Sequence, residues 1–166
     1  MEHSSNAYKH LADSEKWVKR ENNMGDLEIA KNQLQRKNCS LVIAKDSKVI
    51  FETKQSGVSG FLHAIDKFGR SDLYGSSVAD RVVGRAAAML CLYCSVEAVY
   101  AIIASNGGRE VLGEHGVPLE FENLVPNILN RQQTGTCPFE KAVATISDAE
   151  EAYESLKSCI KETRER

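Results

Sequence analysis

The chain has 166 residues, of which 42% are hydrophobic and 27% charged, and its formal net charge is -2. This length supports one domain with a full hydrophobic core and is too short for two. The near-neutral charge gives no field that attracts nucleic acid or an anionic membrane. No apolar run approaches the roughly 18 residues of a membrane span, and the N-terminus lacks the basic and apolar parts of a signal peptide. We therefore expect a cytoplasmic protein with no nucleic-acid partner and no membrane partner.

The first 24 residues are polar and mixed in charge, and we expect them to form an extension that is partly disordered or a frayed helix. Residues 25–166 are expected to form one domain. Its first helix begins at Asp26, a residue type favoured at the N-cap, and continues with apolar residues near helical spacing before it ends ahead of Asn38.

Two short β-type runs, at residues 40–45 and 48–52, flank a two-residue turn, which indicates a tight hairpin. Residues 56–68 follow with apolar side chains on one helical face and Gly69 as a stop. This pattern predicts an amphipathic core helix. His63 lies beside the apolar face, where a surface or hydrogen-bonded histidine is expected.

A strand is expected at residues 73–79 and a small-residue helix at residues 80–93, which places Asp80 at the helix start and Gly84 inside it. A glycine inside a helix costs about 1 kcal/mol relative to alanine, so a packing or ligand requirement must compensate. Residues 96–104 are almost all apolar, which is typical of a central strand buried on both faces.

A further helix is expected from Asn106 to His115, a strand at residues 117–122, and a last helix that begins at Asp148 with Ser147 or Asp148 as its cap. Strands and helices therefore alternate over much of the chain. This order predicts an α/β fold whose sheet has parallel members.

The five cysteines have no pattern of a disulfide scaffold, and we expect most of them to be reduced. Cys91 and Cys94 have the spacing of a redox or metal half-site. However, they fall at the end of an apolar helix, and no second Cys-x-x-Cys is present to complete a zinc site. They are therefore interpreted as small apolar fillers, and no metal site is expected.

The first candidate site is the junction at residues 80–85. On the predicted helix, Arg81 and Arg85 are four residues apart and share a face, while Gly84 leaves room for a ligand beside the backbone. Together with Asp80 they would form a seat for a phosphate or carboxylate group. The alternative is a pair of solvated arginines, with Asp80 as a helix cap and Gly84 as a residue for close packing.

The second candidate site is the junction at residues 130–140. Pro138 suits the first helical position, which makes Cys137 the cap residue, where the helix dipole favours a thiolate. Cys137 is therefore the candidate catalytic residue; the alternative is a structural thiol, with Glu140 capping the same helix. Candidate ligand-binding groups of this segment, which supply polar side chains or amide donors, are Asn130, Arg131, Thr134, Gly135, Thr136 and Glu140.

The chain resembles an uncharacterised family of domains of unknown function with a cytidine-deaminase-like fold. The resemblance runs from about Asn38 to Leu156 and rests on residues 79–88, the pair at 130–131 and residues 134–140. It implies a three-layer α/β/α arrangement with a mixed sheet of about five strands. That arrangement agrees with the order of elements predicted above.

Deaminases of this fold hold zinc through a His or Cys at one helix start and a Pro-Cys-x-x-Cys at the next. The matching starts in this chain are residues 80–85 and 104–109, and neither contains a thiol or an imidazole. We therefore expect no zinc-dependent deamination and no cofactor, although the fold is similar.

The Asp-Arg-x-x-Gly run at residues 80–84 is also similar to a stretch in the accessory sulfurtransferases for formate dehydrogenase, a family that uses a cysteine-bearing loop and binds nucleotide. Three hypotheses follow. The chain binds a nucleotide-like or phosphorylated small molecule, is an enzyme with Cys137 as nucleophile or sulfur carrier, or is an oligomeric scaffold without such a ligand. The corresponding partners are a small-molecule anion or nucleotide, or a second copy of the chain. The first two hypotheses require the two junctions to meet in space.

Overall fold

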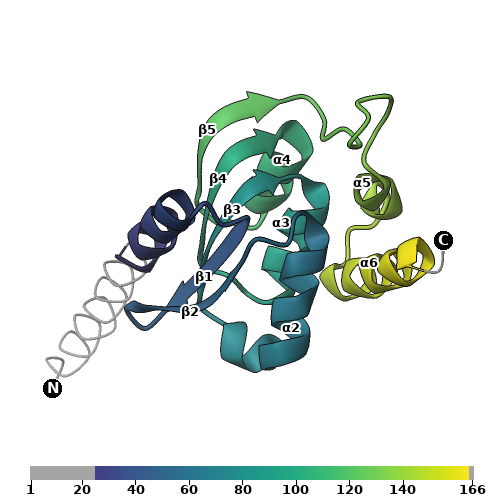
Figure 1. Ribbon diagram of the computed structural model, residues 1–166. Coiled ribbons are helices and arrows are strands. Elements are labelled where there is room, and N and C mark those ends of the chain that lie inside the picture. Colours follow the sequence, from purple (N-terminus) through teal and green to yellow (C-terminus); the bar gives the residue numbers. More distant parts are fainter. Residues whose placement is uncertain (1–24, 165–166) are drawn as a thin grey trace, which may run out of the picture.

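A mixed sheet of five strands lies at the centre of the molecule, and helices cover both of its faces (Figure 1). The computed structural model describes residues 25–164, so the predicted N-terminal extension lies outside the described residues. Residues 25–37 form a helix. The strands are β1 (Leu41–Lys45), β2 (Lys48–Thr53), β3 (Ser77–Val83), β4 (Ala98–Ser105) and β5 (Leu119–Val125). The later helices are α2 (Val58–Leu73), α3 (Arg85–Tyr93), α4 (Asn106–Glu114), α5 (Pro138–Val143) and α6 (Ala149–Arg164).

The strands lie in the order β2-β1-β3-β4-β5. β1 pairs antiparallel with both β2 and β3, whereas β3, β4 and β5 are parallel. The predicted hairpin turn is confirmed: Asp46 and Ser47 have φ angles of 52° and 66°, as in two-residue turns whose twist matches that of paired strands. Because β3, β4 and β5 run in one direction, their last residues share one edge of the sheet, which we call the carboxyl edge.

One face of the sheet is covered by the helix of residues 25–37, whose Leu34 packs in a buried cluster with Tyr100 of β4. The predicted cap at Asp26 is wrong, because residues 25 and 26 are already helical. Instead, the buried carboxylate of Asp26 accepts a hydrogen bond from the backbone N–H of Ser47 at 2.8 Å. This bond fastens the helix to the hairpin turn.

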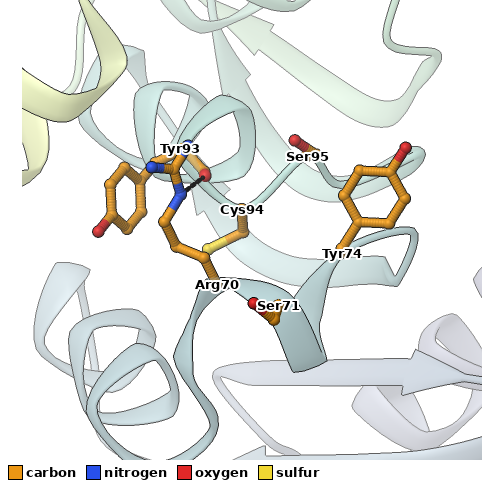
Figure 2. Close-up of a pocket in the computed structure, with 6 residues that line it drawn as sticks. All are labelled: Arg70, Ser71, Tyr74, Tyr93, Cys94 and Ser95. Carbon is orange, nitrogen blue, oxygen red and sulfur yellow. Dashed lines mark hydrogen bonds between the residues drawn. The ribbon is translucent and has the colours of Figure 1, made fainter.

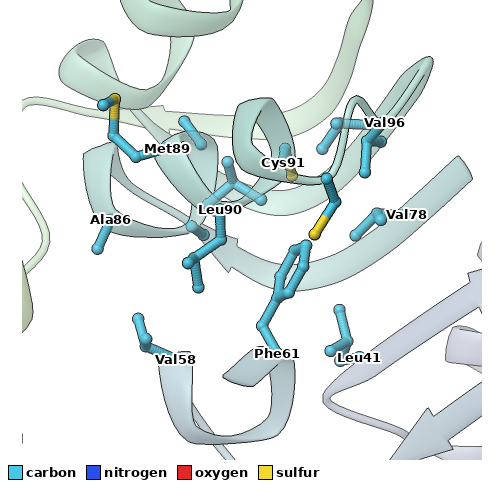
Figure 3. Close-up of a cluster of buried hydrophobic side chains, with 14 of the residues drawn as sticks. Leu41, Val58, Phe61, Val78, Ala86, Met89, Leu90, Cys91 and Val96 are labelled. Carbon is cyan, nitrogen blue, oxygen red and sulfur yellow. The ribbon is translucent and has the colours of Figure 1, made fainter. Parts of the chain in front are cut away.

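On the other face, α3 is buried on nearly all sides because it lies between the sheet and α6. Its residues 86–91 are all buried, as expected for a helix without a polar face. Figure 3 shows these side chains meeting Phe61 of α2 and Val78 of β3 in the main core. On the side of α6, the ring of Tyr93 stacks on that of Tyr153 with centroids 4.2 Å apart.

Cys91 and Cys94 are buried at the end of α3, as the interpretation of apolar fillers predicts. Burial raises the pKa of the Cys94 thiol to about 12, so this thiol stays protonated at neutral pH.

Gly69 produces a kink in α2 and does not end it. Its φ of 75° interrupts the helix, which then continues to Leu73, so the predicted stop is wrong. Beyond the kink, Nε of Arg70 donates a hydrogen bond to the carbonyl oxygen of Tyr93 at 2.9 Å (Figure 2). The Arg70 guanidinium also lies 4.2 Å from the centroid of the Tyr93 ring. These contacts hold the end of α2 against the end of α3.

The first junction differs from its prediction. β3 continues to Val83 and α3 begins at Arg85, so the predicted helix start at Asp80 is wrong. The β-branched side chains of Val82 and Val83 favour a strand, and both residues pair with β4. Gly84 is the N-cap of α3 and is not in the interior of a helix.

The later predicted elements are confirmed with small shifts. α4 begins after Ser105, whose hydroxyl accepts a hydrogen bond from the N–H of Gly108 at 3.0 Å. α6 begins after Asp148, whose carboxylate accepts a hydrogen bond from the N–H of Glu151 at 2.8 Å.

Within residues 25–164, none of the helices combines the length and the apolarity that crossing a membrane requires.

Candidate functional site

The N-termini of α3 and α4 lie against each other at the carboxyl edge of the sheet. A Cβ added to Gly108, in the first turn of α4, would lie 2.6 Å from the carbonyl oxygen of Val83 and 2.9 Å from that of Gly84. The two backbones therefore touch at this point, and only glycine fits. In open α/β sheets, this edge is where ligands commonly bind.

Glu140 joins the two predicted junctions. Its carboxylate oxygens accept hydrogen bonds from the backbone N–H groups of Arg85 and Ala86, at 3.0 and 3.3 Å. Glu140 belongs to the first turn of α5, yet it caps the N-terminus of α3, where the helix dipole favours a negative charge. The segments at residues 80–85 and 130–140 therefore meet in space, as the sequence analysis required.

The contact with Glu140 explains Gly84. A Cβ at this position would lie 2.7 Å from Cδ of Glu140 and 2.8 Å from Cγ1 of Ile128, so no larger residue fits without displacing the capping carboxylate. The predicted room beside Gly84 exists, and a side chain of the protein occupies it.

Arg81 and Arg85 direct their guanidinium groups to neighbouring segments of the chain. Nε of Arg81 donates to the carbonyl oxygen of Cys39 at 2.7 Å, and a second nitrogen donates to the side chain of Asn38. Arg85 donates to the carbonyl oxygens of the last residue of α5, Val143, at 2.9 Å and of Ile146 beyond it at 2.5 Å. Arg81 lies in β3, so the two arginines do not share a helix face as predicted. Their bonds hold neighbouring segments in place.

A small cavity of about 60 Å³ lies under Gly84, between β3 and the N-termini of α2 and α5. Its polar side chains are Asp80, Cys137 and Glu140. Most of the remaining lining is apolar or glycine: Gly57, Val58, Phe61, Val82, Gly84, Ala87, Ile128 and Phe139. Two carboxyl groups and a thiol thus share one mainly apolar wall.

Asp80 is the most perturbed group of this cavity. Although part of the residue reaches the surface, its carboxyl is surrounded by protein atoms, and this desolvation raises its pKa from 3.8 to about 7. A hydrogen bond of 3.2 Å from the backbone N–H of Val82 to Oδ1 opposes the shift only partly. Desolvation also raises the pKa of Glu140, against its bonds to the α3 N-terminus. Carboxyl groups with raised pKa values in a hollow are characteristic of functional sites.

Cys137 is the N-cap residue of α5 and Pro138 its first helical residue, as predicted. The thiol is half-buried and lines the same cavity as Asp80. Glu140 does not cap α5, as the structural alternative for this thiol supposed, because its carboxylate faces α3. The polar neighbours that the cavity gives Cys137 are therefore two carboxyl groups.

The loop at residues 130–136 is held largely by its own hydrogen bonds. The side chain of Asn130 accepts from the N–H of Thr134 at 2.9 Å and donates to the Thr134 hydroxyl at 3.0 Å. The N–H of Asn130 donates to the carbonyl oxygen of Gly135 at 2.9 Å, and Thr136 forms a bridge with residue 129. Asn130, Thr134 and Gly135 therefore shape the loop, which brings Cys137 to the cavity.

Arg131 reaches the start of α2. Its guanidinium is exposed and donates to the hydroxyl of Ser56 at 3.3 Å, and Gly57, the next residue, lines the cavity. This placement adds the N-terminus of α2 to the site. This contribution was not predicted, because residues 56–68 show the pattern of an ordinary core helix. The glycine before the helix was the available signal.

Within residues 25–164, no three His, Cys, Asp or Glu side chains are grouped so that they could hold a metal ion. The starts of α3 and α4, now fixed at Arg85 and Asn106, carry neither thiol nor imidazole.

The fold is that of a mixed α/β domain, and residues 29–160 match the family model TM1506, described as a domain of unknown function (DUF1893). The chain belongs to the DUF1893 family. This result confirms the predicted resemblance to an uncharacterised family.

A solved structure supports the assignment. The crystal structure of a DUF1893 family protein (TM1506) from Thermotoga maritima is similar to this chain, with 29% sequence identity and a TM-score of 0.70. The match covers 77% of this chain and 85% of that one. No curated protein matches the chain.

Proposed function

We propose that this domain binds a small nucleotide-like molecule. The cavity of Asp80, Cys137 and Glu140 receives the polar edge of its base. The observation that supports this proposal is the convergence of two carboxyl groups with raised pKa values in one mainly apolar hollow at the carboxyl edge. A carboxylate in such a place is costly unless something compensates for its desolvation.

The chemistry of Asp80 limits the ligand. With a pKa of about 7, its carboxyl both accepts and donates hydrogen bonds near neutral pH, which suits the amino and ring N–H groups of a nucleobase or an amide. A cavity of about 60 Å³ holds roughly two water molecules, so only the edge of a ligand enters it. The remainder would lie outside, near Arg131 and Ser56. The phosphate seat predicted at Arg81 and Arg85 is less well supported, because both guanidinium groups already have partners.

We also propose that the fold is cytidine-deaminase-like and that the deaminase chemistry is absent. The five-stranded mixed sheet with helices on both faces supports the first part. The second part is supported by the adjoining starts of α3 and α4, where zinc-dependent deaminases of this fold carry their ligands. At the α3 start, this chain has the carboxylate of Glu140 as a cap.

A thermal-shift experiment on the full chain tests the binding proposal. The probes are adenosine, guanosine, cytidine and uridine, which carry no phosphate. We expect at least one to raise the melting temperature of the wild type, because a ligand that binds only the folded state stabilises it. Asp80→Asn should abolish the shift, and Asp72→Asn, an exposed carboxylate outside the cavity, should retain it. Equal melting temperatures with and without all four nucleosides would contradict the proposal.

A second candidate function is supported by the position of Cys137, whose thiol lines the cavity at the N-cap of α5. In this alternative, Cys137 is a nucleophile or a sulfur carrier. Burial raises the pKa of the Cys159 thiol, so free cysteine in solution is the reference. If Cys137 is activated, iodoacetamide at neutral pH should alkylate it about tenfold faster than free cysteine. Equal rates would leave ligand binding as the function of the cavity.

A further inference from the structure

A second hollow lies on another side of α2, between α2 and α6. It has a volume of about 460 Å³, which is within the usual range for small-molecule sites. We call it the α2–α6 cleft. Its lining residues are Gln55, Ser59, Leu62, His63, Asp66, Lys157, Ile160, Lys161 and Arg164.

The charge of this cleft is opposite to that of the chain. Lys157, Lys161 and Arg164 give three positive charges against the one carboxylate of Asp66, whereas the whole chain has a net charge of -2. Residues 157, 160, 161 and 164 lie on one helical face because they are three and four positions apart. Glu162 of the same helix lines a different hollow, beside α5. The two faces of α6 therefore differ in charge.

These cations have no anionic partner in the described part of the chain. The two ion pairs within residues 25–164 are formed elsewhere, by Lys31 and Lys37. The Lys157 ammonium lies 4.9 Å from the centroid of the Tyr153 ring, which leaves its charge uncompensated by a carboxylate. The helix dipole favours cations in the last turn of α6, which accounts for Lys161 and Arg164. Lys157 lies before that turn, so the dipole does not account for it.

The rest of the lining indicates what kind of anion fits. Ser59 belongs to the first turn of α2, which has no acidic residue and, within residues 25–164, no side chain that caps it. The partial positive charge at this end of α2 adds to that of the three cations. Leu62, which is buried, and Ile160, which is half-buried, provide an apolar floor. Lysines bind phosphate as point charges, and arginine binds it through paired donors.

We propose that the α2–α6 cleft binds an organic polyphosphate of nucleotide size. Its phosphates contact Lys157, Lys161 and Arg164, and its uncharged part lies over Leu62 and Ile160. This site is separate from the Asp80 cavity, since the two hollows have no lining residue in common. The inference is independent of the function proposed for that cavity.

Isothermal titration calorimetry on the full chain tests the proposal, with ATP and inorganic tripolyphosphate as probes at low ionic strength. The test variant carries Lys157→Gln, Lys161→Gln and Arg164→Gln. Its matched control carries Arg36→Gln, Lys48→Gln and Arg109→Gln, which remove the same charge from residues that do not line the cleft.

We expect wild type and control to bind ATP with affinities within about twofold of each other, and the test variant to bind about tenfold or more weakly. Raising the salt concentration should weaken binding to the wild type, because exposed charges are screened. ATP should bind more tightly than tripolyphosphate if the apolar floor contributes. Asp80→Asn should leave the affinity for tripolyphosphate unchanged, because this probe carries no base that could enter the cavity.

Three results would overturn the inference: no heat of binding from either probe with the wild type, equal affinities in the test and control variants, or loss of tripolyphosphate binding in Asp80→Asn alone. The last result would place the polyphosphate at the cavity. Equal affinities for ATP and tripolyphosphate would refute the contribution of Leu62 and Ile160.

Discussion

The Asp80 cavity and the α2–α6 cleft flank the same helix and differ in nearly every physical respect. The cavity is small and mainly apolar, and it contains two carboxyl groups with raised pKa values. The cleft is several times larger and lined by cations without carboxylate partners. One site is therefore suited to an uncharged group with N–H donors, and the other to phosphates. A ligand's charge alone should decide which of the two it prefers.

The difference lies in which charged groups already have partners. Arg85 stands at the start of a helix beside the cavity, but its guanidinium bonds to two carbonyl oxygens of the protein. Lys161 stands on an exposed helix face and makes no such bond within residues 25–164. A charged group whose hydrogen-bond donors already bond to the protein would have to break those bonds to bind a ligand.

The largest expected effect is the dependence of folding stability on pH that Asp80 produces. Its pKa is raised in the folded state, so the folded protein holds this proton more tightly than the unfolded chain does. The resulting stability is present below about pH 4 and is lost as the pH rises towards 7. A shift from 3.8 to about 7 corresponds to at most about 4 kcal/mol.

Asp80→Asn should therefore be more stable than the wild type at about pH 8, and the gain should disappear near pH 4. Urea unfolding at several pH values measures this difference. Asp72→Asn, at an exposed position, is the control and should show no such trend. A constant difference between Asp80→Asn and wild type across this range would show that Asp80 titrates as an ordinary carboxyl group.

The next effect concerns the contact between Gly84 and Glu140. Gly84→Ala should destabilise the protein by about 2–4 kcal/mol, because the added methyl group displaces the carboxylate that caps α3. Gly113→Ala is the matched control: it lies in α4, where an added Cβ would meet no atom within 4 Å. That variant should be more stable by about 0.4–1 kcal/mol. Equal melting temperatures for the two variants would contradict the role given to Glu140.

The smallest expected effects are the changes in the free energy of unfolding when a cation of each region is replaced. Arg85→Gln should cost about 1–3 kcal/mol, because two carbonyl oxygens lose their donor. Lys161→Gln should change the free energy of unfolding by no more than about 0.5 kcal/mol. Chemical denaturation measures both. A loss at Lys161 as large as that at Arg85 would show that the cleft cation has a structural partner.

Much of the fold follows from patterns that are local in the sequence. The turn at Asp46 and Ser47, the apolar strand β4 and the capped start of α6 were all predicted, because each depends on residues close together in the chain. The family and the five-stranded mixed sheet were predicted from the resemblance. The prediction began α3 at Asp80 and so placed Gly84 inside it, whereas the β-branched Val82 and Val83 are typical of a strand that ends at this glycine.

The candidate site was predicted only in outline. The meeting of residues 80–85 with Cys137 and Glu140 was anticipated, but the partners of the side chains were not. Glu140 caps a helix that begins 55 positions earlier, and no local pattern reveals such a contact. The cations of the α2–α6 cleft were overlooked for the same reason, because they resemble an ordinary solvated helix face.

The most direct test of the account is a nuclear magnetic resonance titration of the Asp80 carboxyl carbon in the selectively labelled chain. We expect the titration of Asp80 to have its midpoint near pH 7. We also expect the resonance to shift when a nucleoside that raises the melting temperature is added. A midpoint near 3.8, with a resonance that no nucleoside alters, would contradict this account. Asp80 would then be an ordinary surface residue, and the cavity would not be the nucleoside-binding site.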